Sequence, residues 1–337
     1  MKQFDIPVVL FFFKRTDKTL LVLERIAQMR PKKLYLISDG PRNEAEKTDV
    51  EECRRRLEAI IDWPCDVVKN YAEVNKGVFD RIGLGAQWVL RQEASAIFLE
   101  DDNLPELSFF PFCKEMLERY REDTRVLWIC GTNYLKKYEP TDGSSYVFTR
   151  HMLPCGWASW SHKFEKFYEG DLALWDDKYV RERIFHEKFN QGLLKQDMEC
   201  WTRERRRIVS LGKANSWDYQ MSFTLRAHGL FGIVPKFNQI TNIGVDEHST
   251  HGGNTLSNIM TRRFCGLDSF TIDFPLMHPK LVCIDREFEI KILNIILLPF
   301  RYRLKSYFNK LLKSIFMISD EESLTGTMKK RIENFKS

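Results

Sequence analysis

Three consecutive carboxylates, Glu100, Asp101 and Asp102, directly follow the apolar run of residues 96–99. Four apolar residues that end in charge, with Pro105 soon after, are typical of a buried parallel strand. Open α/β sheets bind their ligands at the carboxyl end of such strands. Adjacent carboxylates repel one another, and oxygen donors of this kind suit Mg²⁺ or Mn²⁺ held together with a substrate diphosphate. A solvated acidic turn after a core strand explains these residues equally well.

Two further residues have types suited to binding a nucleotide. Asp39 follows the expected strand 33–38, where its carboxylate would accept hydrogen bonds from a base N–H or a ribose hydroxyl, or would only complete a turn. Arg81 lies near the start of a helix that follows a glycine-bearing turn, within reach of a phosphate.

Later in the chain, one carboxylate and two histidines are candidates for chemistry. Asp218 falls in the first turn of a helix that ends near residue 228, where Ser216 is a plausible N-cap, so a capping role remains open. His248 and His251 lie in a glycine-rich loop beside two carboxylates, and one of them would supply a further metal ligand.

The elements that must position these residues alternate between strands and helices. This alternation predicts an α/β fold with a mostly parallel, Rossmann-like sheet and right-handed crossovers. Neither a G-x-G-x-x-G nor a G-x-x-x-x-G-K-[ST] motif occurs, so the common dinucleotide and P-loop sites are not expected. The first elements expected are strands at 7–13, 33–38 and 65–68 and helices at 19–29 and 43–61.

The middle of the chain changes character. The segment 151–160 is rich in glycine and aromatic residues, which predicts a loop. Exposed tryptophans are costly unless they pack or bind something, so Trp157 and Trp160 would offer an aromatic platform to a sugar ring. The stretch 168–207 predicts several polar helices, and its basic run 203–207 is interpreted as a solvated helix face.

Composition and charge narrow the class of protein further. The 337 residues are 43% hydrophobic and 29% charged, as in an ordinary globular protein, and the net charge of +5 does not support a general nucleic-acid surface. Eight scattered cysteines without metal-ligand spacing predict free, reduced thiols. No signal peptide and no apolar run of the ~18 residues that span a bilayer are present, which favours a cytoplasmic protein.

Taken in order, these motifs resemble those of bacterial GT-A nucleotide-sugar glycosyltransferases, distantly akin to the N-acetylglucosaminyltransferases that start complex-glycan branches. The motifs are the triplet 100–102, the Gly156-Trp157-Ala158-x-Trp160 segment, residues 217–220, and residues 242–244 with Thr250-His251 downstream. The resemblance covers roughly residues 5–275. It implies the GT-A fold for a catalytic domain at 1–285.

The resemblance implies a role for each site residue. Asp102 would be the direct ligand of Mn²⁺ or Mg²⁺, His251 a further metal contact, and Asp218 the catalytic base. A positioned base that takes the acceptor proton is worth about 10²–10⁴ in rate and implies inversion at the sugar. The implied donor-binding residues are Arg15, Asp39, Arg81, Glu100 and Asp101, and the acceptor-binding residues are Gly156, Trp157 and Trp160.

Residues 286–337 lie outside the family pattern. Between residues 290 and 319 there is no acidic residue but six Lys or Arg, and apolar residues recur at i, i+4, i+7 and i+8. An apolar face opposite a basic face predicts a helix that lies on an anionic membrane surface. A helix docked on the core or on a second subunit is the alternative.

The sequence therefore predicts a metal-dependent glycosyltransferase, a hexosyl- or N-acetylhexosaminyltransferase. Its donor would be a nucleotide sugar, with a UDP-sugar favoured, and its acceptor a glycan or a lipid-linked precursor. It would act at the inner face of the cell membrane in lipopolysaccharide or capsule synthesis. One alternative is a nucleotide-sugar nucleotidyltransferase, although the residues after the first strand, 14–17, lack the glycines of its phosphate loop. The other is a non-catalytic carbohydrate-binding or scaffold protein with this fold.

Overall fold

The computed structural model describes residues 3–187, 190–245, 259–318 and 325–328. The chain divides into two compact units, Met1–Asn294 and Ile295–Ser337. Each unit is described by itself.

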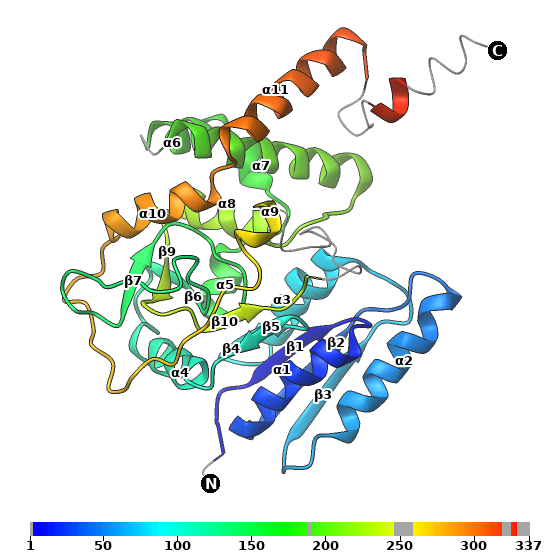
Figure 1. Ribbon diagram of the computed structural model, residues 1–337, viewed down its shortest axis with the longest axis vertical. Helices are drawn as coiled ribbons and strands as arrows, with labels where there is room; N and C mark the ends of the chain where they lie inside the picture. Colours follow the sequence, from blue (N-terminus) through cyan, green and yellow to red (C-terminus); the bar gives the residue numbers. More distant parts are fainter. Residues whose placement is uncertain (1–2, 188–189, 246–258, 319–324, 329–337) are drawn as a thin grey trace. The chain divides into compact units, whose positions relative to one another are not determined.

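The first unit is built on an eight-stranded sheet of order β3-β2-β1-β4-β8-β6-β9-β7 (Figure 1). Six strands run in one direction, and β8 and β7 run antiparallel to their neighbours. The expected mixed, mostly parallel α/β sheet is therefore confirmed. The strands are β1 Val8–Phe12, β2 Lys33–Ser38, β3 Asp66–Tyr71, β4 Ser95–Glu100, β6 Val126–Cys130, β7 Tyr146–Thr149, β8 Trp157–Trp160 and β9 Phe231–Pro235.

Helices connect the strands, and a small antiparallel pair completes the unit. The pair is β5 Asn103–Pro105 with β10 Ile240–Asn242. The helices are α1 Thr16–Met29, α2 Glu44–Ala59, the π-helix η1 Phe79–Gly83, α3 Leu84–Leu90, α4 Phe109–Arg119, α5 Ser161–Phe167, the 3₁₀ turn η2 Ala173–Asp176, α6 Lys178–His186, α7 Gln191–Leu211, α8 Asp218–His228, α9 Ile259–Arg262 and α10 Arg286–Ile296.

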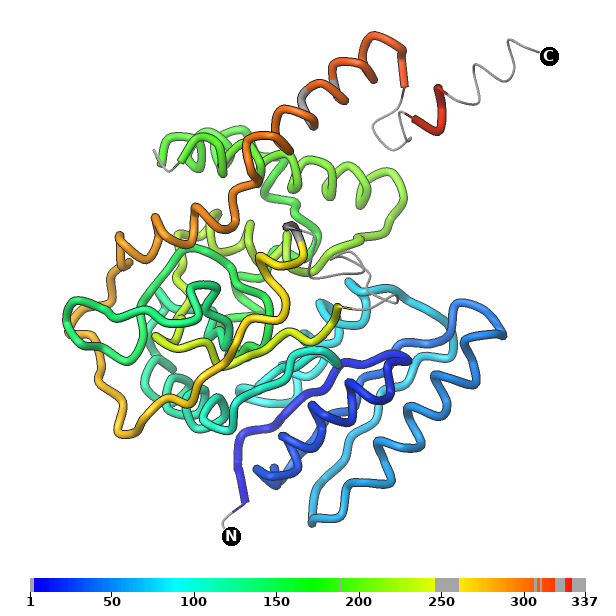
Figure 2. Tube along the Cα trace, viewed as in Figure 1, coloured from blue at the N-terminus to red at the C-terminus, as the bar shows by residue number. Residues whose placement is uncertain are grey.

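Alternation along β1 explains why helices cover both faces of the sheet. Successive side chains of a strand point to opposite faces. Leu10 joins a core with Ile26 of α1 and Leu57 of α2, and Figure 2 shows these two helices side by side along β1 to β3. Phe11 points to the other face, where α3 approaches so closely that a Cβ at Gly85 would lie 3.1 Å from the Phe11 ring.

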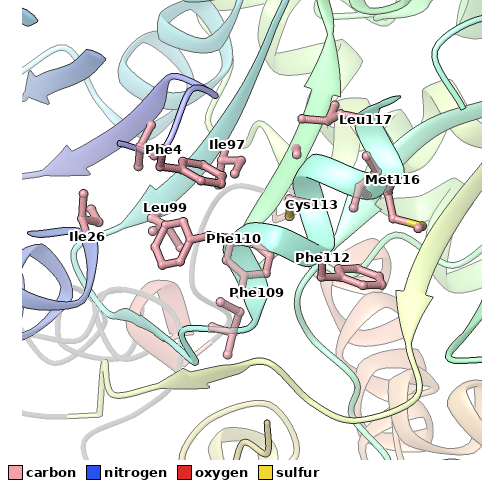
Figure 3. Close-up of a cluster of buried hydrophobic side chains, with 14 of the residues drawn as sticks. Phe4, Ile26, Ile97, Leu99, Phe109, Phe110, Phe112, Cys113, Met116 and Leu117 are labelled. Carbon is pink, nitrogen blue, oxygen red and sulfur yellow. The ribbon is translucent and has the colours of Figure 1, made fainter. Parts of the chain in front are cut away.

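The largest core lies between the first face of the sheet and α4. Figure 3 shows Phe109 and Phe110 of this helix on the side of Ile97 and Leu99 of β4, while Phe112 points away from β4 and belongs to the same core. All five side chains are at most 1% exposed. Burying a side chain of this size contributes about 1.5–3 kcal/mol, so α4 fixes the strand that carries the acidic triplet.

The expected loop at 151–160 is wrong for its second half. Residues 157–160 form β8, which inserts between β4 and β6 and pairs antiparallel with both. Two indoles that flank two small residues, Ala158 and Ser159, suit a fully buried central strand, and Trp157 and Trp160 are each 1% exposed. The stretch 168–207 is helical as expected, but its helices also bury a small core of their own, in which Trp175 and Trp201 pack with Phe223 of α8.

The predicted tail begins inside the first unit. Phe288 and Ile292 of α10 are fully buried, and the Glu289 carboxylate accepts hydrogen bonds from the Thr149 hydroxyl and, at 2.8 Å, from the Arg150 amide. The second unit contains α11, Phe300–Ile315, whose Phe300, Leu304, Leu311 and Ile315 side chains are exposed. Among the described residues, no helix is both long and apolar enough to cross a membrane.

Candidate active site

Polar residues follow three neighbouring parallel strands at one edge of the sheet. The register pairs Phe12 of β1 with Ser38 of β2, and Phe11 with Glu100 of β4. The residues that come next in each strand therefore emerge side by side. This is the ligand-binding edge of an open parallel sheet, and it brings together Arg15, Asp39 and the acidic triplet.

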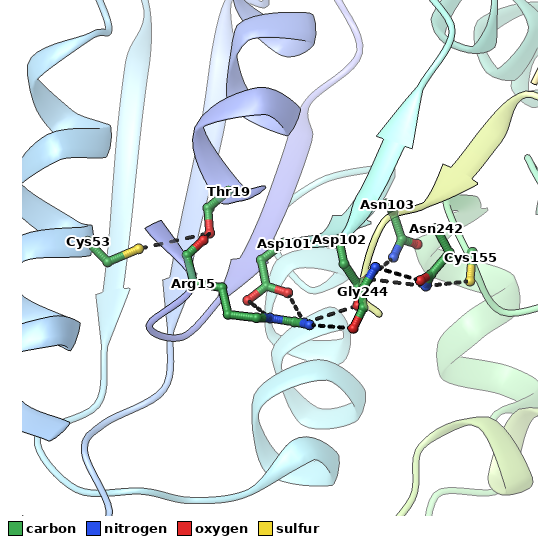
Figure 4. Close-up of polar contacts among 9 residues, drawn as sticks. All are labelled: Arg15, Thr19, Cys53, Asp101, Asp102, Asn103, Cys155, Asn242 and Gly244. Carbon is green, nitrogen blue, oxygen red and sulfur yellow. Dashed lines mark hydrogen bonds and ion pairs between the residues drawn. The ribbon is translucent and has the colours of Figure 1, made fainter. Parts of the chain in front are cut away.

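Arg15 contacts two of the three carboxylates (Figure 4). Its Nη2 lies 2.5 Å from Oδ1 of Asp101 and 3.0 Å from Oδ2 of Asp102, and its Nη1 donates to the Gly244 carbonyl at 3.4 Å. The backbone carbonyl of Arg15 accepts hydrogen bonds from the amide and hydroxyl of Thr19 at the start of α1. The first turn of α1 therefore fixes the backbone from which the guanidinium reaches the triplet.

The Asp102 carboxylate is enclosed by amide groups and a glycine. Its Oδ1 accepts hydrogen bonds from Nδ2 of Asn103 at 2.6 Å and of Asn242 at 3.4 Å. Its Oδ2, which Arg15 contacts, faces Gly244, where a Cβ would lie only 2.2 Å from it. Both carboxylate oxygens of Asp102 therefore accept hydrogen bonds from neighbouring side chains.

Burial is the largest influence on the pKa values of Glu100 and Asp101 in the triplet. Loss of solvent, with the charges of Asp102, Asp101 and Asp218, raises the pKa of Glu100 well above its ordinary value. Burial likewise raises the pKa of Asp101, against the opposing charge of Arg15. Burial opposes the charge of Arg15, but the two aspartates outweigh it and raise its pKa. A positive charge at this place therefore stabilises the site.

Asp39 organises a loop at the end of β2. Its two carboxylate oxygens accept hydrogen bonds from the amides of Gly40 and Lys76 at 2.8 Å, from the amide of Gly77 at 3.0 Å and from Nδ2 of Asn75 at 2.9 Å. These bonds shape the 75–77 turn. The structure thus gives Asp39 a positioning role, and its contact with a nucleotide stays a prediction.

Two arginines lie around this loop, and both donate hydrogen bonds to backbone carbonyls. Arg54 of α2 donates to the carbonyls of Asp39 and Ala72 at 2.9 and 2.8 Å. Arg81 of η1 donates to the Asn70 carbonyl at 2.6 Å, and among the described residues its buried Nε has no partner. Burial lowers the pKa of both guanidinium groups. The region around Arg54 and Arg81, called the anion corner below, is therefore suited to bind an anion such as a phosphate group.

Arg54 is a candidate that the sequence interpretation missed. The signal was available, because residues 50, 53 and 57 form the buried stripe of α2 and position 54 lies beside it at helical spacing. A long basic side chain next to a buried stripe extends over the neighbouring strand ends.

Asp218 lies at the start of α8, as expected. Its Oδ1 accepts a hydrogen bond from the Ser216 hydroxyl, and that hydroxyl accepts one from the Tyr219 amide at 3.2 Å. Ser216 therefore caps the helix, and the Asp218 carboxylate is held in place beside it, half-buried. The second carboxylate oxygen of Asp218 has no hydrogen-bond partner among the described residues.

The acceptor-binding expectation for the two tryptophans conflicts with their burial. The Trp157 ring stacks against Phe98 and Trp128 at centroid distances of 3.9 and 4.3 Å, and Trp160 donates to the Leu117 carbonyl at 2.8 Å. Neither ring offers a face to a sugar, because β8 carries both into the core. An aromatic platform from these residues is therefore incorrect.

Gly156, the third expected acceptor-binding residue, has a structural reason to be glycine. Its φ is +61°, and a Cβ there would lie 2.5 Å from Ile240. Its amide donates to Oδ1 of Asn103 at 2.7 Å. Gly156 thereby orients the asparagine that donates to Asp102.

The expected metal site is only partly described. The carboxylate oxygens of the triplet are the kind of ligand that Mn²⁺ or Mg²⁺ prefers. Arg15, however, already contacts oxygen atoms of Asp101 and Asp102. In the part of the chain that the structure describes, no group of three or more Asp, Glu, His or Cys side chains is arranged to hold a metal. His248 and His251 lie outside the described residues.

The cysteines are free, as expected. All eight are unpaired thiols. Cys155 lies nearest the site, and its sulfur accepts a hydrogen bond from Nδ2 of Asn242 at 3.6 Å. Burial raises the pKa of this thiol well above its ordinary value, so it is not an activated nucleophile.

No protein-family model and no curated protein matches the sequence. Among solved structures, the chain is similar to the mannosyltransferase PcManGT from Pyrobaculum calidifontis in complex with GDP-Man and Mn²⁺. That match has 12% identity and a TM-score of 0.38, and covers 66% of this chain and 69% of the other. Mouse xyloside xylosyltransferase 1 matches with 11% identity and a TM-score of 0.37, over 82% and 100% of the chains. A UDP-glucose pyrophosphorylase in complex with UDP-glucose matches with 11% identity and a TM-score of 0.34, over 69% and 91%. Likeness at this level assigns no reaction to this chain.

Proposed function

We propose that this protein is a glycosyltransferase that moves a sugar from a nucleoside diphosphate, with uridine favoured as the base, to a hydroxyl group. The acceptor is a glycan or a lipid-linked precursor of a bacterial surface polysaccharide. The observation that carries the proposal is the convergence of Arg15, Asp39 and the acidic triplet at adjoining strand ends, with the charge of Asp218 acting on Glu100.

In this proposal, some residues bind the sugar donor and another removes the proton of the acceptor hydroxyl. Arg81 and Arg54 lie around the loop that Asp39 organises and would give positive charge to a diphosphate, and charge-assisted hydrogen bonds to phosphate are strong. The loop that Asp39 holds defines the place of the nucleoside. Asp218 takes the proton of the attacking hydroxyl, as a carboxylate base fixed by Ser216. If Asp218 acts as the base, a single displacement with inversion at the sugar is expected.

A divalent cation at the triplet, with Asp102 as its direct ligand, would supply positive charge to the leaving diphosphate. Asn103 and Asn242 orient the Asp102 carboxylate, and Gly244 leaves room for it. His251 is retained as a proposed further contact.

We propose that the second unit attaches the enzyme to the membrane that carries its acceptor. Exposed apolar side chains on α11 alternate with Arg301, Arg303 and Lys305, a combination that suits the surface of an anionic membrane. We place the protein at the cytosolic face of the cell membrane, where lipid-linked precursors are assembled.

Product analysis tests the proposed reaction directly. The protein is incubated with Mn²⁺ and, in turn, UDP-, GDP- and dTDP-sugars, and the nucleotide released is identified by chromatography. Release of a nucleoside diphosphate, with sugar transferred to an acceptor alcohol or to water, supports a glycosyltransferase. Release of a nucleoside triphosphate on addition of pyrophosphate identifies a nucleotidyltransferase instead. Absence of both reactions points to a non-catalytic protein of this fold.

A further inference from the structure

Arg15 lies where a bound cation would have to be. Its Nη2 contacts the carboxylates of Asp101 and Asp102 at 2.5 and 3.0 Å, and it is the cation in contact with Oδ2 of Asp102 among the described residues. The other oxygen of Asp102 already accepts two amide hydrogen bonds, from Asn103 and Asn242. A metal ion that used Asp102 would therefore meet the guanidinium on Oδ2.

A guanidinium and a divalent cation on one carboxylate oxygen repel each other strongly in a poorly solvated site. Because arginine stays protonated at any physiological pH, Arg15 cannot relieve this repulsion by losing its charge. Its side chain has to move. The backbone of residue 15 is tied to Thr19, so the movement is confined to the side chain, which is 19% exposed.

A nucleoside diphosphate offers Arg15 a new partner of the right chemistry. Phosphate oxygens accept the same forked hydrogen bonds that a carboxylate accepts. Arg54 and Arg81 donate to backbone carbonyls at the carboxyl ends of β2 and β3, the strands that follow β1 in the sheet, so further positive charge lies along the same edge. A diphosphate bound there would draw the guanidinium away from Asp102 and free an oxygen for the metal.

We propose that Arg15 is a displaceable counter-ion of Asp101 and Asp102, which makes the binding of a divalent cation dependent on the binding of a nucleoside diphosphate. Arg15 is thus a positioning residue that keeps metal from binding before the nucleotide, so that the two ligands bind in order. This inference rests on the proposed function, since it requires a nucleoside-diphosphate ligand.

The coupling between the two ligands is measurable without turnover. Mn²⁺ is titrated into the full chain and free Mn²⁺ is followed by electron paramagnetic resonance, alone and with UDP, GDP, CDP or dTDP. Coupling is reciprocal, so the nucleotide tightens Mn²⁺ binding by the factor by which Mn²⁺ tightens nucleotide binding. For the native protein we expect at least a tenfold effect with one nucleotide.

Variants separate the coupling from a general change in charge. Arg15→Gln is expected to bind Mn²⁺ without nucleotide at least tenfold more tightly than the native protein and to lose most of the coupling. Lys47→Gln, which removes one positive charge from an exposed position of α2, should retain both native values. A native circular-dichroism spectrum and a single cooperative unfolding transition show that Arg15→Gln is folded, even though loss of the positive charge lowers its unfolding temperature.

Two outcomes would overturn the inference. In one, the native protein binds Mn²⁺ alone as tightly as Arg15→Gln does. In the other, a nucleoside diphosphate binds and does not alter Mn²⁺ affinity. If no nucleotide binds to either protein with or without Mn²⁺, the proposed function itself fails.

Discussion

Gly244 lies so close to Asp102 that a Cβ at position 244 would lie 2.2 Å from Oδ2 of the carboxylate. The contact joins two segments 142 residues apart in the chain and holds the carboxylate between Gly244, Arg15 and two asparagines. A side chain at this position would have to displace the carboxylate or move the 242–245 segment.

The substitution Gly244→Ala tests this packing. Because the added methyl group would push Asp102 from its hydrogen bonds, we expect turnover to fall at least tenfold, with little change in the thermal unfolding temperature. Gly232→Ala is the control, since a Cβ there meets ordinary contacts of 3.6 Å or more. Native activity in Gly244→Ala, assayed beside that control, would show that Asp102 tolerates displacement.

Asp218→Asn tests the assignment of the base. The amide keeps the shape and accepts the Ser216 hydrogen bond but cannot take a proton, so kcat should fall by about 10²–10⁴. Asp177→Asn is a matched control, because Asp177 also lies at a helix start and accepts a hydrogen bond from the Tyr179 amide at 2.7 Å. Equal kcat for Asp218→Asn and the native enzyme would remove Asp218 from the mechanism.

Arg81→Gln tests the anion corner. Charge-assisted hydrogen bonds contribute about 1.5–3 kcal/mol, so we expect the Kd of the nucleoside diphosphate to rise roughly tenfold or more. Isothermal titration measures this change. Arg91→Gln, which removes an arginine whose side chain is 68% exposed just after α3, should leave the Kd unaltered. A native Kd in Arg81→Gln would place the phosphates elsewhere.

The ion pairs of Glu46 predict how stability depends on pH. Its hydrogen bonds with Arg42 outweigh burial and, together with Lys14, lower its pKa to about 2. A carboxyl group whose pKa is lowered on folding stabilises the folded protein above its unfolded pKa of 4.5, and this contribution is lost as the pH falls from 4.5 to 2.

Chemical unfolding at several pH values checks this prediction. The free energy of unfolding of Glu46→Gln should lie below that of the native protein by on the order of 1 kcal/mol at pH 7, after allowance for solvent screening, and the two should converge near pH 2. Glu52→Gln, on the exposed side of the same helix, provides the comparison. A constant difference between pH 7 and pH 2 would contradict the charge assignment.

The basic helix α11 predicts binding to anionic vesicles. Each Lys or Arg near such a surface contributes about 1 kcal/mol, so the triple change Arg301→Glu, Arg303→Glu and Lys305→Glu should abolish sedimentation with phosphatidylserine vesicles. Lys47→Glu, on α2, should not affect it. Equal binding of the native protein to neutral and anionic vesicles would favour the alternative of a helix that packs against protein.

The sequence predicted the parts of the site that are local. An apolar run ending in charge identified β4 and its triplet, and a carboxylate before Gly40 identified the turn after β2. What it missed depends on long-range pairing. Trp157 could be placed in the core only by knowing that β8 inserts between β4 and β6. The contact of Arg15 with Asp101 joins residues 86 positions apart, and no local pattern encodes it.

The central claim is that the triplet binds a nucleoside diphosphate together with a divalent cation. A thermal-shift panel of UDP, GDP, dTDP, CMP and their sugars, each with and without Mn²⁺, tests it most directly, because a ligand of the folded state raises the unfolding temperature by mass action. We predict that one nucleoside diphosphate stabilises the native protein only when Mn²⁺ is present, and that Asp102→Asn abolishes the shift. A flat panel, or an equal shift in Asp102→Asn, would contradict the claim.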